Sequence, residues 1–178
     1  MTSTVWCPCG RTRRKHDVIT QLTLRIPDGA IGHSIHSALA AWSAWEPLNG
    51  KAFSGAWLDS CDSGDAGCGK RGIRSRRVEL TVLPEVLAIY INRRLPGAAG
   101  KDTRMLSYPL SLSLKQDTAK YSLRSVIVHS GSRGNSGHYY AIARVGQSWF
   151  EFNDADVKEA TAHDATNAQA TMLFYEVL

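Results

Sequence analysis

A histidine and an asparagine in the C-terminal third of this sequence have a spacing that would suit a catalytic pair. His138 follows a run of turn-forming residues, and Asn153 ends the segment Trp149-Phe-Glu-Phe-Asn153. A neutral imidazole can accept a proton on one ring nitrogen while the other donates to an orienting oxygen, such as an Asn amide oxygen. A base held in this way typically serves a Cys or Ser nucleophile.

Two predicted strands would position this pair. The segments 138–145 and 148–152 flank Gly146-Gln147, which predicts a hairpin turn. His138 lies eight residues before Gly146 and Asn153 seven after it, so we expect them to face each other at one end of an antiparallel sheet. On spacing alone, the favoured alternative is a surface histidine beside an asparagine in a turn.

The remaining pattern predicts a mixture of strands and short helices. Ser130–Gly137 predicts a flexible loop that leaves room for a substrate chain. Ser34 can cap a helix whose apolar side is Ile35, Leu39, Trp42 and Trp45, and core packing is favoured over a partner-binding stripe. One helical turn is expected within 160–169. Strands are expected at 18–26, 52–58, 77–82, 86–92, 122–128 and 171–177, and more weakly at 106–112.

Four cysteines form two pairs that could bind a metal. Cys7 and Cys9 make one pair, Cys61 and Cys68 the other, and glycine follows Cys9 and Cys68 as the tight turn of a zinc knuckle requires. The spacings within the pairs are irregular, so a degenerate finger with unliganded thiols is the alternative. A nucleophilic role for Cys7 or Cys9 is disfavoured, since charged residues follow them instead of a helix.

Charge and composition limit the class of protein. The 178 residues carry a net charge of +5, much of it in 11–15 and 70–77. Such basic clusters can bind nucleic acid, but a solvated face flanking a zinc site is favoured. No apolar run reaches the roughly 18 residues of a membrane helix, and no secretory signal is visible. One domain, either alone or with a small appendage, is expected in the cytoplasm or nucleus, with no membrane partner.

Taken together, these motifs resemble the ubiquitin-specific protease family of papain-like cysteine proteases. The resemblance rests on Gly137-His-Tyr-Tyr140, on 149–157, on Leu173-Phe-Tyr-Glu176 and on 83–93, which is similar to the family's Leu-Pro-x-Val-Leu-x-Ile-x-Leu-x-Arg strand. It implies an α+β fold in which a papain-like antiparallel palm sheet carries zinc-ribbon-like fingers. The fingers would span about 1–30 and 51–82, and the palm the remainder.

The resemblance also implies roles for single residues. His138 would be the general base, Asn153 would orient it, and Asp154 would be a second polar candidate. Structural zinc would be held by Cys7, Cys9, Cys61 and Cys68. The activity implied is deubiquitination, the thiol-dependent hydrolysis of ubiquitin C-terminal peptide and isopeptide bonds in the ubiquitin-like conjugation pathway, and the partner is ubiquitin or a ubiquitin-like protein.

One part of the family pattern has no counterpart in this sequence. The family's nucleophilic cysteine lies N-terminal to the fingers, in a Gly-Asn-Thr-Cys-like box on the thumb, and nothing here matches that box. The expectation is therefore the C-terminal part of a catalytic domain, either a fragment or a shortened relative, without its thumb and inactive by itself. The alternatives are a catalytically inactive ubiquitin-binding module and a basic zinc ribbon that binds nucleic acid. The retained histidine box favours the enzyme, and nucleic acid is not expected as a partner.

Overall fold

The chain folds into two compact units. The structure, a computed structural model, describes residues 1–29, 32–48, 68, 74–95, 100–114, 119–134 and 136–178. The first unit consists of Met1–Ile19 and Trp42–Val82, and the second of Thr20–Ala41 and Leu83–Leu178. The expected strand at 52–58 lies outside the described residues, and the division into fingers and palm at the expected bounds stays a prediction.

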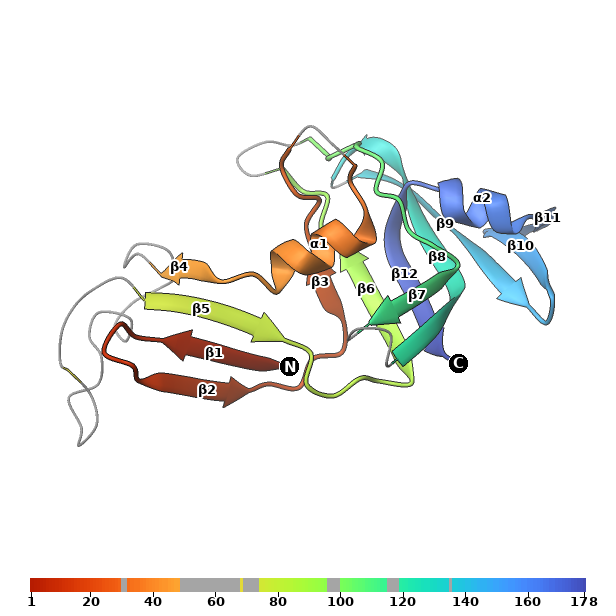
Figure 1. Cartoon of the computed structure of the whole chain (residues 1–178). Coiled ribbons are helices and arrows are strands. Elements are labelled where there is room, and N and C mark those ends of the chain that lie inside the picture. Colours follow the sequence, from red (N-terminus) through yellow and green to blue (C-terminus); the bar gives the residue numbers. More distant parts are fainter. Residues whose placement is uncertain (30–31, 49–67, 69–73, 96–99, 115–118, 135) are drawn as a thin grey trace. The chain divides into compact units, whose positions relative to one another are not determined.

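The first unit contains a four-stranded antiparallel sheet in the order β2-β1-β5-β4 (Figure 1). Its strands are β1 Thr2–Trp6, β2 Thr12–His16, β4 Glu46–Leu48 and β5 Arg74–Glu79. Between β1 and β2, Gly10 adopts φ 90° and its N–H donates to the Cys7 carbonyl at 2.9 Å. The sequence pattern did not predict β1 or β2, because every side chain of β2 is exposed and no apolar alternation marks it.

The second unit contains the larger sheet, in the order β11-β10-β9-β8-β12-β6-β3, with β7 paired to β8. All pairs are antiparallel except β3 with β6. Its strands are β3 Leu22–Leu24, β6 Val86–Ile91, β7 Ser111–Leu114, β8 Ala119–Arg133, β9 Ser136–Val145, β10 Ser148–Asn153, β11 Asp156–Ala160 and β12 Ala170–Val177. The predictions at 86–92 and 171–177 are therefore confirmed, whereas the strand expected at 18–26 is reduced to β3.

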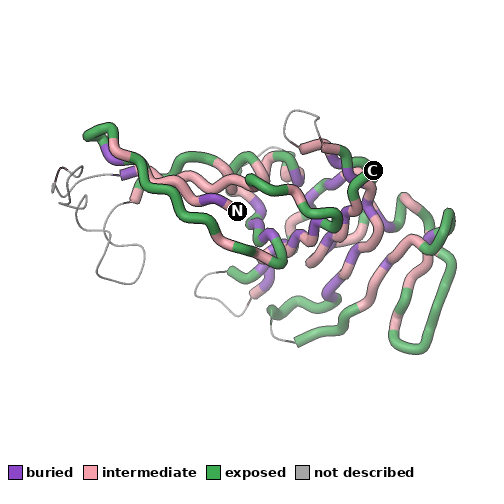
Figure 2. The backbone as a smooth tube through the Cα atoms, turned by 90° about the horizontal axis from the view of Figure 1, so that it is seen from below, coloured by how far each residue is buried: buried purple, intermediate pink, exposed green. Residues whose placement is uncertain are grey.

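The core of this unit lies against the central strands. Leu87, Ile89 and Ile91 are buried along β6, with the period of two that a one-sided strand requires. Leu173 of β12 is fully buried and pairs with Ile89, so the two strands present one apolar face. Further buried residues lie in β3, α1 (Ile35–Trp42), β7 and β8, and Figure 2 shows that the buried stretches are spread over many parts of the chain.

Two short helices occur in the described residues. α1, Ile35–Trp42, begins as predicted at Ser34, whose Oγ accepts the Ser37 N–H at 3.1 Å while Ser37 Oγ accepts the Ser34 N–H at 3.0 Å. The expectation that Trp45 belongs to its apolar side is wrong: the helix ends at Trp42, and Trp45 is 50% exposed. α2, Ala162–Asn167, confirms the helical turn expected there. No helix in the described ranges has the length and apolar character that spanning a membrane requires.

The predicted loop at Ser130–Gly137 is the largest error in the local assignment. β8 continues to Arg133, which pairs with Ser136 in β9, so most of this segment is strand. The pairing is irregular between Ser130 and Arg133, where Gly131 adopts φ 145°. Glycine allows this backbone conformation, so the turn-forming composition marks a distorted hairpin end instead of an open loop.

Candidate functional site

The β9–β10 hairpin brings the predicted pair together with a small offset. Val145 pairs with Ser148 across the turn, and the last pair is Ala141 with Phe152. Continuing this register places Asn153 opposite Tyr140, so His138 is a diagonal neighbour of Asn153 on the same face. The expectation of direct opposition is wrong by two residues: it requires a turn centred between Val145 and Gly146, whereas the register centres the turn between Gly146 and Gln147.

The prediction that His138 and Asn153 lie within hydrogen-bond reach is confirmed. His138 Nε2 is 2.6 Å from Asn153 Oδ1. An amide oxygen only accepts, so Nε2 carries the proton of the neutral ring and Nδ1 holds the lone pair. The His138 side chain is 48% exposed. The ring is therefore held at one nitrogen while its basic nitrogen is the one that can accept a proton.

Asp154, the second candidate, makes a weaker approach to the same nitrogen. Its Oδ2 lies 3.8 Å from His138 Nε2, beyond hydrogen-bond distance, and its side chain is 80% exposed. Its backbone adopts φ 54°, a left-handed conformation that Asp tolerates better than most residues, in the turn between β10 and β11. Geometry therefore makes Asn153 the direct partner of His138 and leaves Asp154 a distant electrostatic contact.

A pocket of about 390 Å³ lies on the same hairpin, but neither His138 nor Asn153 lines it. It is lined by residues of β9, β10, β11 and α2, among them Tyr140, Glu151 and His163. Burial first, and then the nearby Glu151 carboxylate, raise the pKa of Tyr140, so its phenol stays protonated at neutral pH. Tyr140 can therefore donate a hydrogen bond in this pocket.

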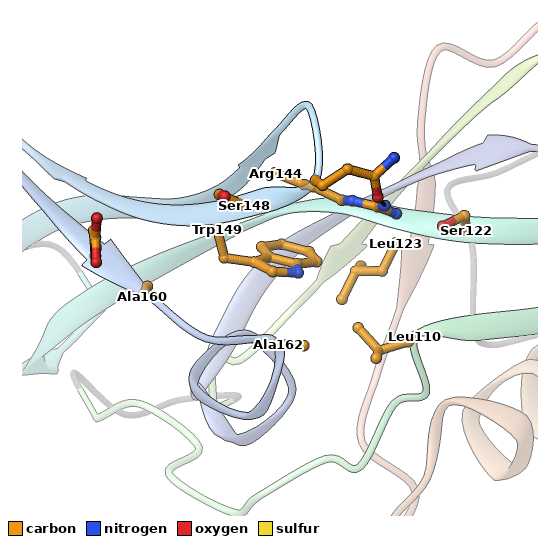
Figure 3. A pocket seen from close by; sticks show the side chains of 10 residues that line it. Leu110, Ser122, Leu123, Arg144, Ser148, Trp149, Ala160 and Ala162 are labelled. Atoms are coloured by element: carbon orange, nitrogen blue, oxygen red, sulfur yellow. Dashed lines mark hydrogen bonds between the residues drawn. The ribbon is translucent and has the colours of Figure 1, made fainter.

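A larger pocket of about 550 Å³ lies at the other end of the hairpin. Trp149 and Arg144, which pair across β9 and β10 beside the turn, line it together with Leu110 and Leu123 (Figure 3). His138 and Asn153 stand at the opposite end of the same strands. The larger pocket is therefore not the site of any chemistry carried out by His138.

Three of the four cysteines come together in the first unit. The Sγ atoms of Cys7, Cys9 and Cys68 all lie within 4.8 Å of one another, and those of Cys7 and Cys68 are 3.8 Å apart. Tetrahedral zinc with Zn–S bonds of about 2.3 Å separates its sulfur ligands by about 3.8 Å. The cluster has the donor set and spacing of a metal site, whereas Cys61, the expected fourth ligand, lies outside the described residues.

The positions of Cys7 and Cys9 bear on whether either could be a nucleophile. Cys7 follows the last residue of β1, and Cys9 lies in the turn before β2. Neither position is the start of a helix, where a thiolate would be stabilised by the backbone. The positions agree with the view that neither cysteine is the nucleophile.

Comparison with known proteins shows the family to which the chain is similar. The family model described as ubiquitin carboxyl-terminal hydrolase matches residues 1–175. The chain is 26% identical over 175 residues to ubiquitin carboxyl-terminal hydrolase 23 of Arabidopsis thaliana. The alignment covers 94% of this chain and 19% of that protein. It is 28% identical over 192 residues to ubiquitin carboxyl-terminal hydrolase 3 of Homo sapiens, covering 94% of this chain and 35% of that protein.

A solved structure shares the fold. The Ubp8/Sgf11/Sus1/Sgf73 SAGA DUB module bound to monoubiquitin contains a chain that superposes with a TM-score of 0.81 at 24% identity, covering 99% of this chain and 40% of that one. The 178 residues thus span between about a fifth and two fifths of the length of the relatives they match.

Proposed function

Because this chain belongs to the ubiquitin carboxyl-terminal hydrolase family, we propose that it supplies the proton-transfer half of a cysteine-type deubiquitinating enzyme. In this proposal His138 is the general base and Asn153 orients it. The reaction is hydrolysis of a peptide or isopeptide bond at the C-terminus of ubiquitin or a ubiquitin-like protein. The observation that carries the proposal is the 2.6 Å contact between His138 Nε2 and Asn153 Oδ1.

This contact suits acyl transfer for a physical reason. With Nε2–H donated to Asn153, Nδ1 is unprotonated and can take the proton of a thiol, which generates the attacking thiolate. The thiolate adds to the scissile carbonyl carbon, and the imidazolium returns the proton to the leaving amine. Water then hydrolyses the thioester, with His138 again accepting a proton. Asp154 adds negative charge near the imidazolium but does not replace Asn153.

The nucleophile in this proposal comes from outside these 178 residues. The sequence contains no Gly-Asn-Thr-Cys-like box, and the three described cysteines form the metal-type cluster of the first unit. The thumb that carries the family's nucleophile would be supplied by further sequence or by a companion chain. Cys7, Cys9, Cys68 and, as the fourth ligand, Cys61 would hold structural zinc in a zinc-ribbon-like finger.

The partner proposed is ubiquitin or a ubiquitin-like protein, in the cytoplasm or nucleus. Support comes from the family and from the chain of similar fold, whose module is described as bound to monoubiquitin. An inactive ubiquitin-binding module of the same fold remains the second candidate. Its basis is the missing cysteine box, because a base without a thiol has nothing to activate.

Hydrolysis of a fluorogenic ubiquitin amide separates the two candidates. The chain by itself is expected to be silent, and addition of a thumb segment that carries the nucleophilic cysteine is expected to produce turnover. His138→Ala should then remove turnover by about 100- to 10,000-fold, the usual contribution of a general base. His36→Ala, which changes an exposed histidine on α1, is the matched control and should be neutral.

Two results would each decide against part of this proposal. Ubiquitin binding without turnover in the presence of the thumb segment would establish the binding module. Turnover by the chain alone that is abolished by Cys7→Ser or Cys9→Ser would place the nucleophile in the first unit.

A further inference from the structure

A buried histidine lies on β8, the strand next to the one that carries His138. His129 of β8 is only 5% exposed and pairs across the sheet with Tyr139. The two rings stack, with their centroids 4.6 Å apart and their planes inclined at 35°. Side chains alternate across a strand, so Tyr139 and Gly137 face away from the side that His138 occupies.

Gly137 makes room for the same ring. A methyl group at this position would lie 2.3 Å from His129 Nε2 and 2.3 Å from the Ser130 carbonyl oxygen, and the backbone adopts φ 153°. The His129 ring therefore lies directly against the main chain of Gly137. Both residues that flank His138 in sequence are thus in contact with one buried side chain.

His129 is itself held from the interior by a lysine. Lys101 is 7% exposed, and its Nζ donates to the His129 carbonyl oxygen at 2.5 Å. Burial, and secondarily the charge of Arg93, lower the pKa of Lys101. An ammonium group that has lost its hydration needs this acceptor, so the bond ties the segment around Lys101 firmly to the end of β8.

Arg93 holds the segment that contains Lys101 in place. Its side chain is buried, and its Nε donates to the Ala170 carbonyl at 2.8 Å. Its Nη1 donates to the carbonyl oxygens of Asp102 and Arg104 at 3.0 and 2.8 Å. Ala170 pairs with Val128, the residue before His129. The contacts therefore run from Ala170 of β12 through Arg93 and the segment that contains Lys101 to His129.

We propose that Lys101 and His129 are positioning residues that hold the main chain on both sides of His138 and so keep its ring at Asn153. The inference rests on the proposed role of His138 as the base. The His138 side chain is half exposed and has little packing of its own. Its direction is therefore set by its backbone and by the bond to Asn153, and the backbone is held through Gly137 and Tyr139.

Nitrogen-15 spectra of the histidine rings in the 178-residue chain test this directly. The wild-type His138 ring is expected to show the Nε2–H form, with well-separated Nδ1 and Nε2 shifts. In Lys101→Met the two shifts should move toward each other as both tautomers become populated. The amide protons of Gly137 and Tyr139 should exchange about tenfold faster or more. Lys120→Met, which changes an exposed lysine on β8, the strand of His129, should leave both signals unchanged.

A second variant keeps the test decisive if Lys101→Met does not fold. Tyr139 is 57% exposed, so Tyr139→Leu removes the ring stacking without entering the core, and the same spectral change is expected. If the folded variants keep the wild-type tautomer and amide exchange, the positioning role is overturned. Asn153→Ala separates this from the proposed function: unchanged His138 shifts in that variant would refute the His138–Asn153 pairing itself.

Discussion

At the scale of single residues, the candidate site depends on one short contact between two polar side chains. His138 and Asn153 are joined at 2.6 Å, whereas Asp154 approaches the same nitrogen only to 3.8 Å. Hydrogen bonding falls off steeply over that interval, and an exposed ion pair is worth little in water. The two neighbouring residues of the turn should therefore differ widely in importance.

This difference can be measured with a pair of substitutions in the chain supplemented with a thumb segment, the form in which we expect turnover. Asn153→Ala should lower kcat by about 100-fold or more, because the neutral ring loses the partner that selects its tautomer and orientation. Asp154→Ala should lower it by less than about fivefold, in keeping with an exposed pair worth at most about 1 kcal/mol. The reverse order of effects would make Asp154 the orienting residue.

Two glycines of the β8–β9 end provide a matched test of local crowding. Gly137→Ala should destabilise the chain by about 2 kcal/mol or more, because the new methyl group would meet the Ser130 carbonyl and the His129 ring at 2.3 Å. Gly134→Ala has open space around the added carbon and should change stability by less than about 0.5 kcal/mol. Thermal unfolding of both variants measures the difference, and equal effects would argue against the close packing of His129 on Gly137.

At the scale of elements, short local signals fix where strands and helices begin. α2 is only Ala162–Asn167, yet its start is secured by a capping box. Asp164 N–H donates to Thr161 Oγ1 at 3.1 Å, and Asp164 Oδ2 accepts from Thr161 N–H and Oγ1 at 2.8 and 2.6 Å. These bonds from the Thr161 side chain and then its backbone lower the pKa of Asp164.

The sign of that pKa change predicts how the cap responds to pH. A carboxyl group with a lowered folded-state pKa stabilises the fold above its unfolded value of about 3.9, and this contribution is lost as pH falls through the folded value. Thr161→Ala should therefore lower Tm by about 2–4 °C at pH 7, and the difference from wild type should shrink as the pH falls below the unfolded value of about 3.9. Thr161→Ser, which keeps the hydroxyl, should show little change. A difference that is constant with pH would exclude the carboxylate from the cap.

At the scale of the whole molecule, the candidate metal site and the candidate catalytic pair belong to different units. The thiol cluster belongs to the first unit and the His138–Asn153 pair to the second. Ten of the 21 Lys and Arg residues and six of the 16 Asp and Glu residues lie in the segments of the first unit. Most of the net positive charge is thus carried by the unit with the metal-type cluster, which agrees with a basic surface beside a structural site.

Zinc removal tests the role of that cluster. We expect about one zinc per chain by elemental analysis, with Cys68→Ser and Cys61→Ser each lowering zinc content and Tm, because a tetrahedral site loses a ligand. Chelation should accelerate amide exchange in β1, β2 and β5, and added zinc should reverse it. Purified wild-type protein without zinc would contradict the assignment, and normal zinc content in Cys61→Ser would exclude Cys61 as the fourth ligand.

The sequence by itself determined the features that depend on neighbouring residues. Ser34 as a helix cap, Gly146-Gln147 as a two-residue turn, and the strands at 86–92 and 171–177 all follow from turn chemistry and hydrophobic period, which act over a few residues. The contact of His138 with Asn153 could also be predicted, because one short hairpin joins them. Family resemblance supplied the meaning of that contact, and the matching family model confirms the family.

Tertiary structure alone decided how distant segments meet. Nothing local to Lys101 indicates that it donates to His129, and nothing local to β2 indicates a strand, since both depend on partners far along the chain or on the neighbouring strand. The approach of Cys68 to Cys7 closes a separation of 61 residues. The period of the side chains shows which face of an element is buried but not which segment covers it. The contact of Lys101 with His129 and the approach of the thiols are therefore visible only in the folded chain.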